Sequence, residues 1–429
     1  MKNIGYIMLL SLCFIACNNE PKQAPITNSN DYNKYLEQDA KASYKAAITE
    51  KKFWSNRLGA DSTGIGDLGP LAGAYTRIFQ TGGAIENLKK AEALYNKAIA
   101  VASPILKDSY VRALAHNYIS QHRFKEANAM LEKSYAGPSN KHATELMLFD
   151  SYMEIGAYNK ANEVLIKLKN NSDYNYLIRV AKWSDHNGDL DAAIRYLEKA
   201  RDIAESRDSK PLKIWTYSNI ADFYGHDGNI KASYDHYLKT LELQPDNAYV
   251  KKGIVWILYS KERNTKEANR ILDTLIKNHN IPDYYLLKAE MAEFENDQQT
   301  AEKYTNKFLE ATDNEKYGGM YNTYKIEVLV NSNPTAALQL AKAEVKNRAT
   351  PETYHLLALA QLKNGLKTKA LQTIEQHVAN KSPEPMALFH SAMVYKANGL
   401  SKKVRPLKEL LLEASYELGP VIAAQVAEL

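Results

Sequence analysis

"WTYSNIADFYGHDGN", residues 215–229, is the stretch of sequence that decides the fold. Its first ten residues carry apolar and small side chains at helical spacing, and Gly225 to Asn229 then form a turn that contains two glycines. A second helical pattern follows, with Ser233 and Tyr237 on one face. Small residues such as Ala221 matter because two helices approach to about 8 Å only where the facing side chains are small. The stretch therefore predicts a pair of closely packed antiparallel helices.

The same arrangement recurs along the chain, and such self-similarity is typical of repeat proteins. Turn positions fall at His122, Gly156, Gly188, Gly228, Gly365 and Gly399. Three of the intervals are 156 − 122 = 34, 188 − 156 = 32 and 399 − 365 = 34 residues. The helical positions that repeat are Ala115, Tyr118, Ala127 and Leu131; Tyr152, Ala161 and Leu165; Leu177, Ala181, Ala193, Leu197 and Ala200; Tyr354, Leu357, Ala358, Ala370 and Ile374; and Leu388, Ala392 and Tyr395.

This pattern of large, small and aromatic positions, with a turn glycine and prolines between the pairs, resembles the tetratricopeptide repeat. The resemblance covers residues 108–416 and implies an all-α fold, a right-handed superhelical solenoid of antiparallel helix pairs. We expect atypical helix pairs in residues 31–107 and a tail or capping segment in residues 417–429, because terminal repeats must cover the ends of the stack.

Three places depart from the repeat. The interval from Gly188 to Gly228 is 228 − 188 = 40 residues, which predicts an insertion near residues 205–213. Trp256 occupies a position that is usually small, so its helix pair is expected to splay or rotate. Residues 318–349 have no turn glycine and place Asn331-Ser332-Asn333-Pro334 there instead.

The N-terminus predicts a lipid anchor. A short positive segment is followed by an apolar stretch from Ile4 to Ile15, which is too short for a membrane span of about 20 residues and typical of a signal peptide. Phe14-Ile15-Ala16-Cys17 resembles a bacterial lipobox, which implies cleavage of residues 1–16 and lipidation of Cys17. Residues 17–30 are polar and contain two prolines, so we expect a flexible tether. The expected location is the Gram-negative envelope, at the outer membrane, on its periplasmic face or at the cell surface.

Composition narrows the chemistry. The chain of 429 residues has two cysteines, one in the signal segment and one at the lipidation site, so we expect no disulfide framework, thiolate metal site or cysteine nucleophile. A net charge of +5 without a basic run gives no indication of nucleic-acid binding. The ten histidines are scattered without metal-ligand spacing, and Glu290 and Glu293 fit a solvated helix face. We expect no enzyme activity, no metal and no cofactor.

Gly64-Ile65-Gly66-Asp67-Leu68-Gly69 has the spacing of a dinucleotide-binding loop. That chemistry needs a strand before the loop and a helix that opens at the third glycine. Here a helical segment precedes the glycines, so we predict a loop between helices, with Pro70 at the start of the next helix, and no nucleotide site.

The concave wall of the solenoid is the candidate binding site. Helical phase directs a charged residue from each successive pair toward this wall: Arg112, His116, Asp150, Lys182 and Asp222. These side chains either orient a bound protein or peptide from the envelope or are simply solvated. The leading hypothesis is a lipid-anchored scaffold, and the alternative is a glycan- or solute-binding surface lipoprotein. The array shows no large insertion that would form a pocket, which disfavours the alternative.

Overall fold

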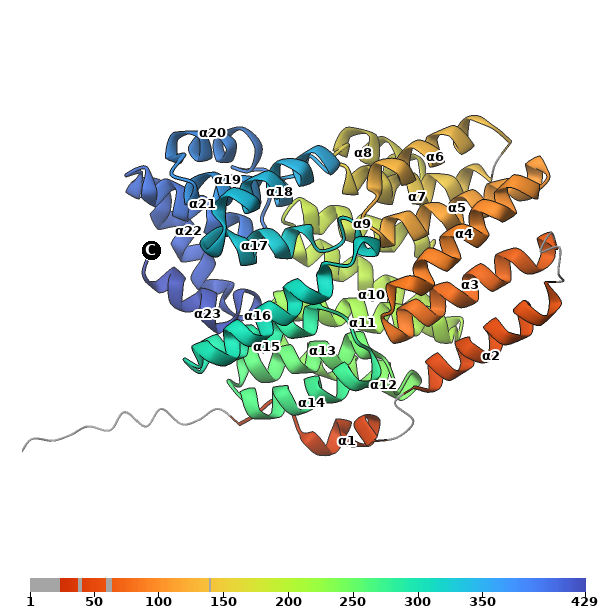
Figure 1. The fold of residues 1–429 in the computed structure, drawn as a ribbon, viewed down its shortest axis with the longest axis horizontal. Coiled ribbons are helices and arrows are strands. Elements are labelled where there is room, and N and C mark those ends of the chain that lie inside the picture. The colour runs from red at the N-terminus through yellow and green to blue at the C-terminus, as the bar shows by residue number, and fades with distance from the viewer. Residues whose placement is uncertain (1–23, 38–40, 59–63, 139) are drawn as a thin grey trace, which may run out of the picture.

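The structure is a computed structural model that describes residues 24–37, 41–58, 64–138 and 140–429. Within these residues the regular elements are helices, and most consecutive helices from α2 onward pack as antiparallel neighbours, whereas α1 packs on α12 (Figure 1). The predicted all-α solenoid of tetratricopeptide type is confirmed. The elements are α1 (Ser29–Glu37), α2 (Ala42–Arg57), α3 (Ile65–Gly82), α4 (Ile85–Val101), α5 (Pro104–Ser120), α6 (Phe124–Ala136), α7 (Lys141–Glu154), α8 (Tyr158–Lys167), α9 (Tyr174–His186), α10 (Leu190–Ser206), α11 (Lys210–His226), α12 (Ile230–Leu243), α13 (Ala248–Trp256), η1 (Ile257–Lys261), α14 (Thr265–Asn278), α15 (Asp283–Phe294), α16 (Gln298–Thr312), η2 (Glu315–Tyr317), α17 (Asn322–Ser332), α18 (Pro334–Asn347), α19 (Pro351–Lys363), α20 (Lys367–His377), α21 (Pro385–Ala397), α22 (Ser401–Glu413) and α23 (Ser415–Ala427).

The turns within the pairs follow from backbone conformation. Gly156 and Gly228 both have φ of 76°, a left-handed conformation that glycine adopts without a steric penalty. His122 adopts φ of 57° at the equivalent turn between α5 and α6. Where the turn glycine is missing between α17 and α18, the Asn333 side chain caps α18 by accepting a hydrogen bond from the Ala336 N–H. Each turn reverses the chain within a few residues, which places its two helices side by side.

The repeated small residues form the contact between helices. The alanines at the predicted positions have no exposed surface: Ala115, Ala127, Ala221, Ala358 and Ala392. Large side chains such as Phe149 and Leu197 fill the spaces between successive pairs. The core is therefore a continuous line of packed side chains along the array, as stacked repeats require.

The array curves until distant parts of the chain meet (Figure 1). Lys125 Nζ at the start of α6 donates to the carbonyl of Lys346 in α18 at 2.6 Å, and Asn347 Nδ2 donates to the carbonyl of His122 at 3.1 Å. A Cβ atom on Gly156 would lie 2.5 Å from the Ala349 carbonyl oxygen. We call this meeting of residues 122–125 and 154–156 with residues 346–350 the closure contact.

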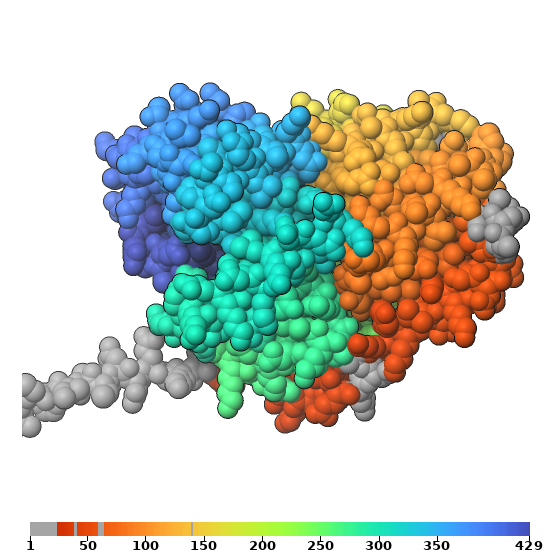
Figure 2. Space-filling model, in the orientation of Figure 1, coloured from red at the N-terminus to blue at the C-terminus, as the bar shows by residue number. Residues whose placement is uncertain are grey.

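The middle of the chain also contacts the N-terminal part. Lys316 Nζ in η2 lies 3.1 Å from Glu86 Oε1 in α4, and a Cβ on Gly83 would lie 2.7 Å from the Asn280 carbonyl oxygen. Figure 2 shows the teal segment pressed against both the orange and the blue parts of the surface. The solenoid is thus folded on itself rather than open along its length.

The N-terminal segment is anchored earlier than its composition predicts. Ile26, within the expected tether, packs against a core cluster, and Thr27 donates from its N–H (2.7 Å) and hydroxyl (2.9 Å) to Glu262. The Tyr32 hydroxyl in α1 donates to Glu267 at 2.8 Å. A tether could therefore extend to residue 25 at most. The signal segment, residues 1–16, and Cys17 lie outside the described residues.

The glycine-rich loop predicted before Pro70 is wrong. Gly66, Gly69 and Pro70 lie inside α3. The Tyr110 hydroxyl donates to the Ile65 carbonyl at 3.0 Å, and a Cβ on Gly69 would lie 2.4 Å from the Tyr110 ring. Gly69 therefore allows α5 to approach α3 closely, which is a packing role that the spacing of the glycines does not reveal.

The other positions that depart from the repeat lie within helices or in short turns between them. The extra residues near 205–213 lengthen α10 and α11, which are joined by a short turn. After Trp256 the backbone continues as the π-helical turn η1, and α22 continues through Pro406. The C-terminal segment is a helix, α23, that packs against α11, α15, α21, α22 and η1. Among the described residues, no helix has the length and apolar character needed to span a membrane.

Candidate binding cavity

The five predicted wall residues lie on the first helices of successive pairs. Arg112 and His116 are on α5, Asp150 on α7, Lys182 on α9 and Asp222 on α11. The structure brings His116 and Asp150 together, but burial lowers the pKa of His116 despite the opposing effect of the Asp150 charge. This imidazole is therefore neutral at neutral pH.

Four of these five side chains have polar partners within the chain. Arg112 Nη1 is bonded to Asp108, and Asp150 accepts from Arg179 Nη2 at 2.6 Å. Lys182 Nζ donates to Glu154 at 2.9 Å. Arg112, Asp150 and Lys182, on the wall between α5 and α9, are therefore each bonded to another side chain of the protein.

Glu154 connects this wall to the closure contact. Its carboxylate lies 2.9 Å from Lys182 Nζ and 3.4 Å from Arg348 Nη1. Burial opposes ionisation of Glu154, but the two cations lower its pKa below the ordinary value. The charges of Glu154, Lys182 and Arg348 therefore help to hold the curved array together.

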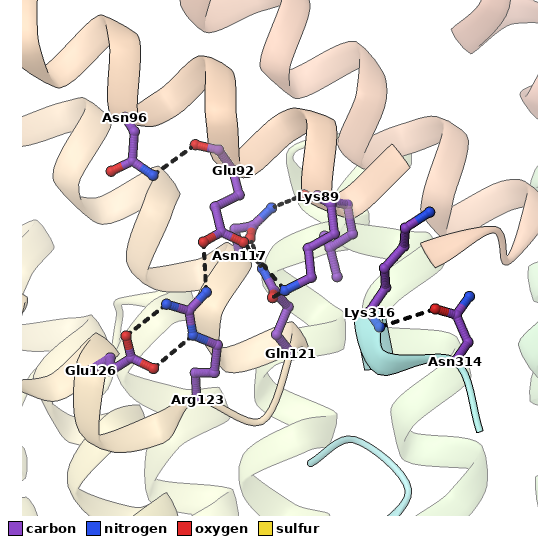
Figure 3. Close-up of polar contacts among 10 residues, drawn as sticks. Lys89, Glu92, Asn96, Asn117, Gln121, Arg123, Glu126, Asn314 and Lys316 are labelled. Carbon is purple, nitrogen blue, oxygen red and sulfur yellow. Dashed lines mark hydrogen bonds and ion pairs between the residues drawn. The ribbon is translucent and has the colours of Figure 1, made fainter. Parts of the chain in front are cut away.

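A second paired cluster lies on α4, α5 and α6 (Figure 3). Glu92 accepts from Arg123 Nη1 at 2.6 Å and from Gln121 Nε2 at 2.9 Å, and Arg123 also forms a two-point contact with Glu126 at 2.7 and 2.6 Å. Burial opposes ionisation of Glu92, but the bonds from Arg123 and Gln121 lower its pKa. Bidentate contacts of this kind fix arginine geometry.

A cavity of about 1260 Å³ opens where α11, α13, α15, α16, α17 and α23 face one another. Of the five predicted wall residues, only Asp222 lines it. Asp222 accepts hydrogen bonds from the hydroxyls of Tyr237 (2.6 Å) and Tyr249. Burial nevertheless raises the pKa of Asp222 above the ordinary value. The array forms this cavity by curving, so the expectation that a pocket needs an insertion was wrong.

Carboxyl groups predominate in the cavity wall. The acidic side chains are Asp222, Asp283, Glu290, Glu293, Glu302, Glu327 and Glu417, whereas the basic ones are Lys252 and His226. Lys252 Nζ lies 3.8 Å from Asp283 Oδ2. Among the residues that line the cavity, the acidic groups therefore outnumber the basic ones.

Glu290 and Glu327 are the most perturbed of these acids. Burial raises the pKa of each to about 7, and the Glu293 and Glu290 charges respectively add to the effect. Glu290 accepts one hydrogen bond, from the Tyr259 hydroxyl at 3.0 Å. Glu327 forms no hydrogen bond or ion pair with any residue that the structure describes. Both side chains can accept a proton or a cation.

Aromatic side chains share the same wall. Tyr249 is 56% exposed and Tyr324 38% exposed, and both line the cavity with Trp256 and Tyr416. Exposure of aromatic rings on this scale within a cavity leaves their faces free for contact with a ligand. The combination of exposed rings with the carboxyls of Glu290 and Glu327, which have no ion-pair partner among the described residues, distinguishes this region from the paired wall at α5–α9.

A second cavity of about 990 Å³ adjoins the first. Gly225, His226, Tyr416 and Glu417 line both cavities, so the start of α23 lies between them. The Tyr416 carbonyl accepts from Trp256 Nε1 at 3.2 Å and from Ser260 Oγ at 2.6 Å, which fixes this boundary to η1. Burial raises the pKa of Glu384, in the second cavity, to about 7.

Sequence reasoning missed the acidic cavity. Glu290 and Glu293 were expected on a solvated helix face; Glu293 is exposed, but both line the cavity. The spacing of Glu290 and Glu293 along the helix is the same on a solvated face as on a cavity wall, so the sequence does not separate the two settings. Among the described residues, no three histidine, cysteine or acidic side chains are grouped to hold a metal ion.

Comparison with known proteins gives structural likenesses alone. No family model and no curated protein matches the chain. The human IFIT1 dimer with PPP-AAAA is 14% identical over 73% of this chain and 71% of that one, with a TM-score of 0.45. Yeast Tom70 is 15% identical over 94% and 95%, with a TM-score of 0.36. A tetratricopeptide repeat protein from Parabacteroides merdae is 16% identical over 56% and 98%, with a TM-score of 0.33. The helix pairs themselves define the fold.

Proposed function

We propose that this protein is a non-enzymatic, lipid-anchored scaffold of the bacterial envelope that binds a segment of a partner protein. The observation that carries the proposal is the cavity of about 1260 Å³, to which α11, α13, α15, α16, α17 and α23 all contribute. Exposed aromatic rings are the side chains that most often supply binding energy at protein interfaces. A groove built from helices suits an extended or helical peptide.

Position-specific crosslinking in the native envelope tests the site. Asn306 is exposed on α16 and lines the cavity, so a benzophenone amino acid at this position should crosslink a bound partner. Glu163 is exposed on α8 and belongs to neither cavity, which makes the same replacement there the matched control. Mass spectrometry should identify a protein attached from Asn306 and absent from Glu163. Equal products from both positions would contradict binding in the cavity.

The lipid anchor is tested separately. A single acyl chain binds membranes only marginally, whereas several chains hold a protein stably. We expect Cys17→Ala protein to leave the membrane fraction after a salt wash, while the unmodified sequence stays. Retention of the Cys17→Ala protein in membranes would show that something other than lipid holds it there. Separation of the inner membrane from the outer membrane would then test the proposed outer-membrane location.

Binding of a glycan or small solute is the second candidate function. The observation in its favour is the cavity itself, with the exposed rings of Tyr249 and Tyr324, since aromatic faces stack against sugars. Calorimetric titration with neutral oligosaccharides should give heat that disappears in a Tyr249→Ala, Tyr324→Ala variant. We favour the protein partner because the cavity wall is dominated by carboxyl groups, which neutral sugars leave uncompensated. The same wall opposes nucleotides and nucleic acids, whose phosphates it would repel.

A further inference from the structure

Glu290 and Glu327, in the larger cavity, differ from the acids on α7 in having no ion-pair partner among the described residues. At the closure contact Glu154 lies against Lys182 and Arg348, and on α7 Asp150 is bonded to Arg179. Glu290, in contrast, has only a tyrosine hydroxyl, and Glu327 has no bonding partner among the described residues. A carboxylate out of contact with water is costly unless a cation or hydrogen-bond donors compensate it.

The geometry of the wall adds a second, independent feature. Tyr324 is on α17 with Glu327, and Tyr249 and Trp256 are on α13 across the cavity from α17. Tyr324, three positions before Glu327 on the helix, lies on the same helical face. Ammonium and guanidinium groups are attracted to the faces of tyrosine and tryptophan rings. Aromatic faces beside uncompensated carboxyls are a recognition surface for organic cations.

The size of the cavity limits which kind of ligand could supply positive charge to its carboxyl groups. A metal ion would use a small part of about 1260 Å³, and the described residues contain no grouping suited to one. Several carboxyls are spread over α11, α15, α16, α17 and α23, so the complementary ligand carries several positive charges at different points along its length.

We propose that the cavity binds a segment of a partner protein that carries several lysine or arginine side chains. One cationic group is held in the part of the cavity that Glu290 and Glu327 line. The aliphatic parts of neighbouring lysine or arginine side chains lie against Tyr324 and Tyr249. This inference rests on the proposed function, since it names the chemistry of the bound segment. It excludes acidic peptides, which the same carboxyls repel.

Titration of the purified full chain with synthetic peptides tests the inference. The probe is a fluorescent, end-capped peptide of alternating lysine and alanine, and the matched peptide has glutamate in place of lysine. We expect the lysine peptide to bind and the glutamate peptide not to bind. Glu290→Gln, Glu327→Gln double substitution should weaken the lysine peptide about tenfold or more, because removing the anionic partners leaves the cation desolvated. Glu163→Gln, on the outer face, should leave its affinity unchanged.

Protonation gives a readout that a purely structural role of the two acids would not change. Because burial raises the pKa of Glu290 and Glu327 to about 7, cation binding must displace protons near neutral pH. We expect affinity for the lysine peptide to rise between about pH 6 and about pH 8, and the rise to disappear in the double variant. Thermal melting of the variants checks that they fold, which glutamine should permit because it has nearly the shape of glutamate.

The outcomes separate this inference from the scaffold function. Equal affinity of the unmodified protein and the double variant, or binding of the glutamate peptide, overturns the inference while crosslinking from Asn306 still supports a scaffold. Binding of spermine without binding of the lysine peptide assigns the cation site to a free polyamine and overturns the peptide assignment. Binding of the lysine peptide without any crosslinked partner supports the cation site and contradicts the scaffold.

Discussion

Gly156→Ala tests whether the array is closed on itself in solution. Gly156 has φ of 76°, and a Cβ at this position would lie 2.5 Å from the carbonyl oxygen of Ala349. Gly228 has the same φ of 76°, but nothing lies within 4 Å of its Cβ position. Both replacements strain the backbone equally, so the difference between them isolates the closure contact.

The expected losses of stability follow from two costs, that of the left-handed backbone conformation and that of the steric contact with Ala349. A left-handed conformation costs a residue with a Cβ about 1–2 kcal/mol, which is the full effect expected for Gly228→Ala. At Gly156 the Cβ also forces the Ala349 segment away, and overpacking of this kind adds about 1–3 kcal/mol. The backbone oxygen of Ala349 cannot rotate aside as a flexible side chain would. Gly156→Ala is therefore expected to destabilise the protein by about twice as much as Gly228→Ala or more.

Urea unfolding followed by far-UV circular dichroism measures the difference, with small-angle scattering of both variants in buffer. Gly365→Ala is a second control, since Gly365 also has φ of 76° and an open Cβ position. We expect the Gly156→Ala protein to show an earlier transition and a larger radius of gyration than either control. If all three variants unfold together and keep the same radius, the closure contact contributes nothing and the reasoning is refuted.

Three further predictions concern the core and its buried titratable groups. Ala221 has no exposed surface, so Ala221→Leu should overpack α11 against α12 and lower stability by about 1–3 kcal/mol; an unchanged unfolding midpoint would contradict the repeat register. The pKa of Glu327 is raised from 4.5 to about 7 in the folded protein, so the folded state loses stability as pH rises through that window. Glu327→Gln should therefore melt higher than the unmodified protein at about pH 8 and equally at about pH 4, and an identical shift at both values would argue against the raised pKa. The Nδ1 atoms of His355 and His390 lie 2.8 Å apart in a buried site, and burial lowers both pKa values, that of His390 from 6.5 to about 3. Stability from this neutral pair is complete above pH 6.5 and is lost as pH falls below it, and imidazole nitrogen NMR shifts should show both rings neutral in the folded protein at about pH 5.

The local features of the fold could be predicted from the sequence because their causes are local. Left-handed turns need glycine or a tolerant residue, as at Gly228, and close helix contacts need small residues, as at Ala221. The glycines at 64–69 misled the prediction because glycine also serves close helix packing, and its partner, Tyr110, lies 41 residues beyond Gly69 (110 − 69 = 41).

The candidate site could be predicted only in part, since it depends on how far the array curves. Asp222, one of the residues that helical phase directs to the inner wall, lines the cavity, but a phase argument does not reveal that Lys182 is bonded to Glu154. Glu290 on α15 and Glu327 on α17 are separated in the chain by α16 and η2, and nothing near either residue in the sequence shows that they share a cavity. Curvature accumulated over many repeats brings α11 and α23 together at the wall of this cavity.

The closure contact also has a mechanical consequence. An open solenoid lengthens elastically under load, because each helix pair can rotate slightly against the next. Here the bonds from Lys125 to the Lys346 carbonyl and from Asn347 to the His122 carbonyl join turns that are more than 200 residues apart in the chain. Extension must break these bonds before the pairs can rotate, so the closed array resists extension more strongly than an open one. A load applied across the array would therefore act on a body of fixed dimensions.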